Sequence, residues 1–227
     1  AYIFKYANGI WTETKLTADD GVANDEFGYS VSISSDGLTA IVGAYSDESS
    51  KGSAYIFKYA NGIWTETKLT AGDPAVGDYF GYSVSISDDG LTAIVGAYRD
   101  DSFKGSAYIF KYANGSWSQK EKLTANDRVA NDRFGYSVSI SGDGLTAIVG
   151  ADGDDGVSDN LGNSGSAYIF KYANGRWSQK EKLTAGDPAV GDYFGYSVSI
   201  SDDGLTAIVG AYRDDSFKGS AYIYNYL

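Results

Sequence analysis

The sequence predicts an all-β protein built from four copies of one unit. The copies are marked by four tryptophans, Trp11, Trp64, Trp117 and Trp177, and by four Phe-Gly pairs that begin at Phe27, Phe80, Phe134 and Phe194. Within each copy, apolar and polar residues alternate over short segments, which is the period of a half-buried strand rather than of a helix. A unit of this length made of strands predicts a chain of similar, successive sheets.

Each unit contains four alternating segments. In the first complete unit they are residues 29–34, 38–44, 53–59 and 63–69. Asp36-Gly37 joins the first pair and Asn61-Gly62 joins the last pair, and both dipeptides suit two-residue hairpin turns, which require positive φ angles. The unit is therefore predicted to be a four-stranded antiparallel meander, the blade of a β-propeller, with the Phe-Gly-Tyr-Ser strand innermost and the tryptophan strand outermost.

Residues 1–227 are predicted to form a single propeller domain. Its repeat cores are residues 27–70, 80–124, 134–184 and 194–226, and residues 1–17 supply N-terminal strands that complete a blade. Residues 1–6 and residues 220–226 both have the pattern of a third strand, so they compete for one place in the blade that begins at Phe194. We expect the strand that is left over to pair with another copy of the chain, because an unpaired strand edge is a template for association.

The net charge and the absence of two residue types exclude several classes of function. The chain has 18 Lys and Arg against 30 Asp and Glu, and its net charge of −12 disfavours nucleic acid and anionic membrane surfaces as partners. It contains no His and no Cys, so a Ser-His-Asp triad, a Cys-His pair or a His-ligated metal cannot form. Adjacent acidic residues are more typical of solvated loops than of a glycosidase pair, and we expect no enzymatic activity.

One loop of the third unit is six residues longer than its counterparts and is rich in oxygen ligands. Between residues 152 and 163 it carries Asp152, Asp154, Asp155 and Asp159 among flexible glycines. Carboxylates are the ligands that Ca²⁺ prefers. A glycine comes one position too early for the Asp-x-Asp-x-Asp-Gly pattern, so a plain polar loop is the favoured interpretation. We expect no cofactor, with Ca²⁺ at this loop as the alternative.

Aromatic residues in loops are the candidates for ligand binding. They are Tyr45, Tyr98, Phe103, Tyr212 and Phe217. Such side chains stack on sugar rings and anchor protein partners, although they also seal gaps between blades. Residues 68–109 and 182–223 are identical at all 42 positions. A duplicated surface presents the same contact twice and gains avidity, whereas a catalytic pocket needs one unique arrangement of residues.

The segment Phe27-Gly-Tyr-Ser-Val-Ser-Ile followed by Ile41-Val-Gly-Ala-Tyr45 resembles the FG-GAP repeat of integrin α-subunit propellers and of bacterial surface proteins. The resemblance recurs in all four units and implies a propeller fold. Tyrosine or Asp152 replaces the proline of the family pattern. Many family members bind calcium between the first two strands of a blade, but here that connection is only Ser-Asp-Asp-Gly or a near variant. The resemblance therefore implies no calcium site at those positions.

These observations predict a non-catalytic, secreted or cell-surface binding and adhesion propeller whose repeated loops contact a protein or a glycan. The alternative is a structural protein that self-assembles into a larger ring or fibre by strand pairing between chains. Extracellular location is compatible with a chain that has no thiols.

Overall fold

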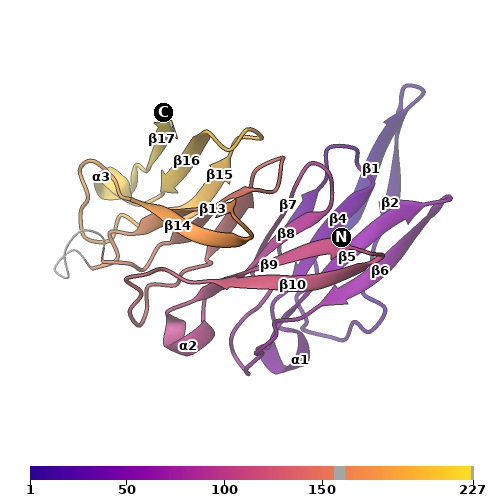
Figure 1. Cartoon of the computed structure of the whole chain (residues 1–227), viewed down its shortest axis with the longest axis horizontal. Helices are drawn as coiled ribbons and strands as arrows, with labels where there is room; N and C mark the ends of the chain where they lie inside the picture. The colour runs from indigo at the N-terminus through magenta and orange to yellow at the C-terminus, as the bar shows by residue number, and fades with distance from the viewer. Residues whose placement is uncertain (156–161, 226–227) are drawn as a thin grey trace.

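The computed structural model describes residues 1–155 and 162–225 and shows an all-β protein made of successive antiparallel sheets (Figure 1). β1 (Tyr2–Ala7) and β2 (Ile10–Lys15) form a two-stranded sheet. Three four-stranded blades follow: β3 (Val31–Ile33), β4 (Thr39–Ala44), β5 (Ser53–Ala60) and β6 (Ile63–Leu69); β7 (Ser83–Ile86), β8 (Thr92–Ala97), β9 (Ser106–Ala113) and β10 (Ser116–Leu123); and β11 (Ser137–Ile140), β12 (Thr146–Ala151), β13 (Ser166–Ala173) and β14 (Arg176–Leu183). A three-stranded sheet of β15 (Phe194–Ile200), β16 (Thr206–Ala211) and β17 (Ser220–Asn225) ends the described fold.

The order of strands confirms the predicted meander. In every complete blade the strands pair in sequence order, from β3 to β6, from β7 to β10 and from β11 to β14. The helical elements are single turns of four residues: α1 (Asp47–Ser50), α2 (Asp100–Phe103) and α3 (Asp214–Phe217), each between the second and third strands of its sheet. Their central residues have left-handed φ angles, such as 49° at Asp101, so these turns are tight loops rather than regular helices. None of the described helices has the length and apolar character needed to cross a membrane.

The two kinds of hairpin turn differ. At Asn61-Gly62 both residues have positive φ, 52° and 87°, as a two-residue turn requires. The prediction for Asp36-Gly37 is wrong in part, because only Gly37 has a positive φ. There the Asp36 carboxylate accepts hydrogen bonds from the Ser34 hydroxyl at 2.6 Å and from the Leu38 amide at 2.8 Å. These bonds favour a longer loop, since the aspartate side chain stabilises it locally.

The innermost strands of neighbouring blades are joined through serines. The Val84 amide donates to Ser30 Oγ at 3.0 Å, and the Ile86 amide donates to Ser32 Oγ at 3.2 Å. The next two interfaces repeat the second contact, from Ile140 to Ser85 and from Ile200 to Ser139. Small polar residues therefore let adjacent inner strands approach and satisfy one another's amides, which explains the Ser-Val-Ser-Ile pattern.

Glycines inside the second strands mark the closest approach between blades. The Gly96 backbone lies against the Gly135 carbonyl of the next blade, and a Cβ atom on Gly96 would overlap that oxygen and Ser83 Oγ. Gly43 and Gly150 have the same relation to Gly81 and Gly195. Only glycine fits these positions, because any side chain would meet the neighbouring backbone.

The core lies between blades. Phe80, Phe134 and Phe194, the phenylalanines of three Phe-Gly pairs, are fully buried. The Phe134 ring packs edge to face on Tyr168 and Phe170 of the same blade, with centroids 5.5 and 5.8 Å apart. Each apolar cluster spans two sheets, so a blade is stabilised by its neighbours rather than alone.

The N-terminal pair does not complete the last blade within this chain. Among the described strands, β1 and β2 pair only with each other, and they lie at the opposite end of the molecule from β15–β17 (Figure 1). The physical reason is that Ile3 and Leu16 pack on the β3–β6 blade, against a cluster that includes Val42. That burial holds the pair beside its neighbour in sequence.

Candidate ligand-binding surface

A row of tyrosines runs across the blades at the start of the inner strands. It consists of Tyr29, Tyr82, Tyr136 and Tyr196, one from each sheet from β3–β6 onward. Neighbouring ring centroids are 4.9, 5.1 and 5.1 Å apart along the row. The Tyr29 hydroxyl donates to the Tyr82 hydroxyl at 3.0 Å, and the Tyr82 hydroxyl donates to that of Tyr136 at 3.1 Å. We call this set the tyrosine row.

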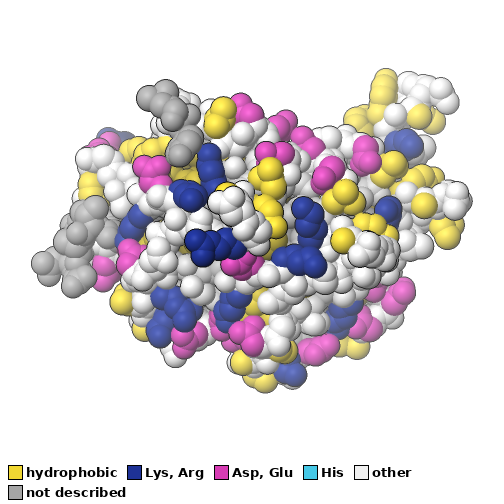
Figure 2. All heavy atoms as spheres, viewed as in Figure 1, with side chains coloured by type: hydrophobic (Ala, Val, Ile, Leu, Met, Phe, Trp, Pro, Cys, Tyr) yellow, Lys and Arg dark blue, Asp and Glu magenta, His cyan; other side chains and the backbone are white. Residues whose placement is uncertain are grey.

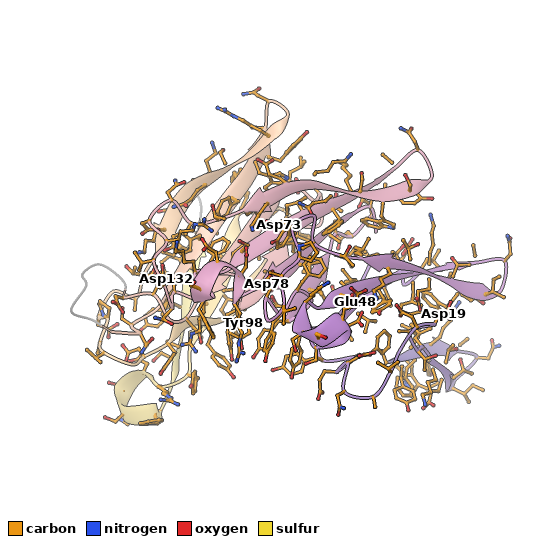
Figure 3. All side chains as sticks on the ribbon, turned by 90° about the horizontal axis from the view of Figure 1, so that it is seen from below. Asp19, Glu48, Asp73, Asp78, Tyr98 and Asp132 are labelled. Carbon is orange, nitrogen blue, oxygen red and sulfur yellow. The ribbon has the colours of Figure 1, made fainter. Side chains whose placement is uncertain are left out.

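The predicted loop aromatics lie beside the tyrosine row. Tyr45 contacts Tyr29 and Tyr82, and Tyr212 contacts Tyr196, with centroids 4.4 to 5.5 Å apart. Tyr98 is buried against Tyr82 and Tyr136, so it seals the gap between two blades. Phe103, Tyr212 and Phe217 are exposed, with 37%, 42% and 72% of their surface accessible. The structure thus brings the candidates beside the tyrosine row, and three of the five rings are exposed. Figure 3 shows Tyr98 at this end of the blades.

Arginines stack on this aromatic surface. The Arg99 guanidinium lies 4.0 Å from the Tyr79 ring centroid and 5.0 Å from that of Phe103. Arg213 has the same relation to Tyr193 and Phe217, at 4.7 and 5.2 Å. Cation–π contacts of this kind hold the guanidinium over the face of the ring. The surface therefore combines aromatic faces, phenol hydroxyls and fixed positive charge.

The third unit replaces this stack with an ion pair. Arg133 occupies the place of Tyr79, Asp152 that of Tyr98, and Gly153 that of Arg99. Arg133 Nε lies 3.2 Å from the Asp152 carboxylate, which is almost fully buried. A Cβ atom on Gly153 would overlap the Asn131 carbonyl oxygen and, less closely, the Arg133 side chain. Arg133 and Asp152 therefore form a paired replacement, and the close approach of the Asn131 backbone restricts the third position to glycine.

Asp152 gives the stability of the protein a dependence on pH. Burial raises the pKa of Asp152 to about 6, although Arg133 opposes the shift. Because the folded-state pKa is above the unfolded value, the stabilisation is complete below the unfolded pKa and is lost as pH rises through about 6. We expect wild type to gain about 2 kcal/mol relative to Asp152→Asn between pH 7 and pH 4. Urea denaturation of both proteins across that range measures this difference, and parallel curves would contradict it.

Three further polar clusters lie next to the loops between the second and third strands of the blades. Each cluster is built around one lysine. In the second blade, Lys122 Nζ lies 2.6 Å from Asp73 and 2.5 Å from Asp100. The Tyr108 hydroxyl donates to Asp73 at 3.0 Å. Burial alone would lower the pKa of Lys122, but its hydrogen bonds with Asp100 and Asp73 outweigh burial and raise it. The ammonium thus stays charged and neutralises both carboxylates.

The same cluster recurs in the blades on either side. Its members are Asp20, Asp47, Tyr55 and Lys68 in the first blade, and Asp127, Asp154, Tyr168 and Lys182 in the third. A further aspartate stands nearby in each unit, such as Asp78, whose carboxylate accepts a hydrogen bond from the Ala75 amide at 2.7 Å. Burial raises the pKa of Asp78. Figure 3 shows Asp73, Asp78 and Glu48 close to the helical turns.

The four metal candidates are not brought together as one group. Asp152 pairs with Arg133, whereas Asp154 pairs with Lys182 and accepts a hydrogen bond from Tyr168. Asp155 accepts a hydrogen bond from the Asn163 amide, and Asp159 lies outside the described residues. Within residues 1–155 and 162–225, no group of three or more carboxylates is arranged to hold a metal ion. The absence of a cofactor stays the prediction, with calcium at this loop as the alternative.

Chelation of calcium is expected to change the melting temperature little. One lysine ammonium group already pairs with two carboxylates in each of three blades, so these carboxylates are poor ligands for a divalent cation. A ligand that binds only the folded state would raise the melting temperature as its concentration rises. Thermal unfolding with added Ca²⁺ and with a chelator tests this. A large calcium-dependent increase that Asp154→Ala abolishes would overturn the expectation.

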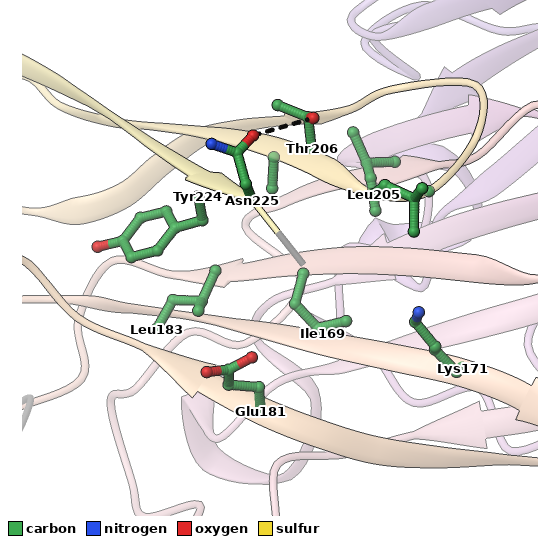
Figure 4. A pocket seen from close by; sticks show the side chains of 11 residues that line it. Ile169, Lys171, Glu181, Leu183, Leu205, Thr206, Tyr224 and Asn225 are labelled. Atoms are coloured by element: carbon green, nitrogen blue, oxygen red, sulfur yellow. Dashed lines mark hydrogen bonds between the residues drawn. The ribbon is translucent and has the colours of Figure 1, made fainter. Parts of the chain in front are cut away.

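A small cavity lies away from this surface. It occupies about 70 Å³ between β13–β14 and β16–β17, where Thr206 donates a hydrogen bond to Asn225 at 3.2 Å (Figure 4). Pockets for small molecules are usually several hundred Å³. This cavity is a packing gap at the side of a blade and is too small for such a ligand. Wider open grooves, of about 550 and 630 Å³, lie between the β1–β2 pair and the β3–β6 blade.

Blades of four strands, repeated turns and a shared inner edge define a repeat protein of the β-propeller type. The model of the FG-GAP repeat matches residues 11–57, 64–110, 117–170 and 177–224, and the chain belongs to this family. Human integrin alpha-11 is 30% identical over 157 residues, which cover 60% of this chain and 13% of that protein. The solved structure of Kuenenia stuttgartiensis hydrazine synthase is similar over 92% of this chain and 49% of its own, with a TM-score of 0.56 and 16% identity. At that identity the likeness shows the fold alone.

Sequence reasoning missed the tyrosine row, the stacked arginines and the lysine clusters. The tyrosine row and the lysine clusters each had a signal that recurs once per unit. A tyrosine stands two residues after every Phe-Gly phenylalanine, and a lysine precedes the leucine that ends each complete tryptophan strand. The stacked arginines had no such signal, because Arg99 and Arg213 are replaced by Ser46 and Gly153 in the other units.

Proposed function

We propose that this chain is a non-catalytic binding and adhesion module of the cell surface or extracellular space, whose repeated loops contact a protein or glycan ligand. The observation that carries the proposal is the continuous aromatic surface with exposed rings at Phe103 and Phe217. Aromatic residues with a polar edge and arginines are the residues that dominate binding energy at interfaces. The relationship to integrin alpha-11 supports a cell-surface setting.

Duplication of this surface supports binding rather than catalysis. The turns α2 and α3 belong to the two identical stretches 68–109 and 182–223, and one blade separates them. A ligand with repeated epitopes can engage both turns, and the second contact then forms at high effective concentration. We expect a polymeric ligand to bind more tightly than its isolated repeating unit.

A screen against immobilised glycans and extracellular proteins tests the proposal and separates the two ligand classes. The expected result is saturable binding to at least one class, with the ligand recovered unchanged. Recovery of cleaved or modified ligand would show an enzyme instead. Binding of neither class would contradict the proposal.

Self-assembly is the second candidate, and the end sheets favour it. Tyr2 and Phe4 on β1 are 53% and 56% exposed, whereas their counterparts in complete blades are buried beneath the preceding sheet. Ile208 and Ile223 on β16 and β17 are also exposed, at 44% and 67%. Apolar side chains gather over β1–β2 in Figure 2. In this candidate assembly, the exposed face of β1–β2 in one chain packs against the exposed face of β15–β17 in a second copy.

Opposite charges at the two ends would align β2 of one chain with β17 of another. Tyr222 on β17 donates to Asp187 and Asp214, as in the lysine clusters, but within residues 1–155 and 162–225 no outer strand with a lysine pairs with β17. Lys15 on β2 is the equivalent residue. Light scattering over a concentration series should show association that weakens when residues 1–17 are deleted and also in Lys15→Met. A chain that stays monomeric at high concentration would exclude this candidate.

A further inference from the structure

The tyrosine row also has the composition of an oxidation site. The chain contains no Cys, Met or His but 20 tyrosines. Cysteine and methionine are the side chains that oxidants usually attack first. Without them, an oxidant that removes single electrons acts on tyrosine and tryptophan. The four rings of the row touch in sequence, and the end rings Tyr29 and Tyr196 are 51% and 40% exposed, so an oxidant reaches the row from either end.

The geometry of the row suits a bond between neighbouring rings. Tyr29 and Tyr82 meet at their hydroxyl edges, with oxygens 3.0 Å apart and ring planes tilted by 41°. Tyr82 and Tyr136 have nearly the same arrangement, at 3.1 Å and 50°. Because each hydroxyl is flanked by its two ortho carbons, these carbons of neighbouring rings lie at the same edge. Both pairs link separate blades.

We propose that the tyrosine row is a site of oxidative cross-linking, at which a peroxide-driven one-electron oxidant of the haem peroxidase class joins Tyr82 to Tyr29 or Tyr136 as dityrosine. Each phenol gives one electron to the oxidant and releases its hydroxyl proton. The two phenoxyl radicals couple through ortho carbons, and the hydrogen on each coupled carbon moves to the oxygen, which restores both phenols. The pair has then lost two electrons and two protons, and one hydrogen peroxide takes them up to form two water molecules.

Treatment of the purified chain with a peroxidase and hydrogen peroxide, followed by tryptic digestion and mass spectrometry, tests the proposal. The expected product joins peptide 16–51 to peptide 69–99 and is lighter than their sum by two hydrogen atoms. Peptide 134–171 should be joined in the same way to a peptide of sequence 69–99. Because residues 183–213 have that same sequence, variants are needed to assign the second link.

Tyrosine variants assign the links. Tyr82→Phe should lower the link between peptides 16–51 and 69–99 at least tenfold, and Tyr29→Phe, at an exposed position, should do the same without risk to folding. Tyr79→Phe is the matched control, since Tyr79 lies in the same peptide outside the row, and it should retain the link.

Several outcomes would overturn the proposal. They are equal yield in Tyr82→Phe, links that form only between molecules, and an equal yield when oxidation is carried out in a denaturant. Absence of any dityrosine in the wild-type chain would also overturn it. None of these results depends on whether the chain binds a ligand.

Discussion

Replacing Lys122 by methionine should destabilise the protein strongly. The substitution keeps most of the side-chain volume but leaves the Asp73 and Asp100 carboxylates without the ammonium that lies 2.6 and 2.5 Å from them. Asp100 is buried, but the Asp73 side chain is 55% exposed and solvent screens its charge, so the expected cost is about 2 kcal/mol. For a chain of this length that corresponds to a fall of roughly 4 to 8 °C in melting temperature.

Lys111→Met is the matched control for this prediction. It makes the same change of residue and of net charge on β9 of the same blade, at an exposed side chain. Its expected effect on the free energy of unfolding is within about 0.5 kcal/mol, as for most surface substitutions. Equal losses in the two variants would show that net charge, rather than the cluster around Lys122, sets the stability.

Replacing Gly96 by alanine is expected to separate two blades. A Cβ atom there would overlap the Gly135 carbonyl oxygen of the next blade, and backbone cannot rotate aside as a side chain can. Overpacking a tight contact costs typically up to about 3 kcal/mol, and a backbone obstacle places this site at the upper end. Chemical denaturation followed by tryptophan fluorescence measures the loss.

Gly186→Ala is the corresponding control. No other group lies within 4 Å of a Cβ atom at Gly186, and the residue has no left-handed φ. We expect no loss of stability, or a small gain from reduced freedom of the unfolded chain. A Gly96→Ala protein as stable as Gly186→Ala would mean that the blades are not in close contact at this point.

Local patterns predicted most of the blade. Alternation over Ser53-Ala-Tyr-Ile-Phe and the Asn61-Gly62 turn depend on residues close in sequence, and the structure confirms both. The length of the turn at Asp36-Gly37 was harder to predict. It depends on a hydrogen bond from the Leu38 amide to the Asp36 carboxylate. Such a bond competes with the backbone preference of the dipeptide.

Contacts between units could not be predicted from the sequence patterns. The cluster around Lys68 joins Asp20, 48 residues earlier, to Asp47 on a different loop. The sequence separations of Asp20 and Asp47 from Lys68 do not predict these contacts. The contacts form only because the meander places the outer strand beside both loops. The same holds for the tyrosine row, since Tyr29 meets Tyr82 only when successive blades stack. The ends differed from expectation because burial of Ile3 against the adjacent blade competes with ring closure.

One binding measurement tests the central claim most directly, that the repeated aromatic turns hold the ligand. It compares the affinity of wild type with that of the double variant Phe103→Ala/Phe217→Ala for the glycan or protein that the screen identifies. The control is Leu91→Ala/Leu205→Ala, which changes equally repeated, partly exposed residues in the turns between the first and second strands. We predict that the phenylalanine variant loses at least tenfold in affinity and that the leucine variant binds as wild type does. Equal affinity of the phenylalanine variant and wild type would contradict the account.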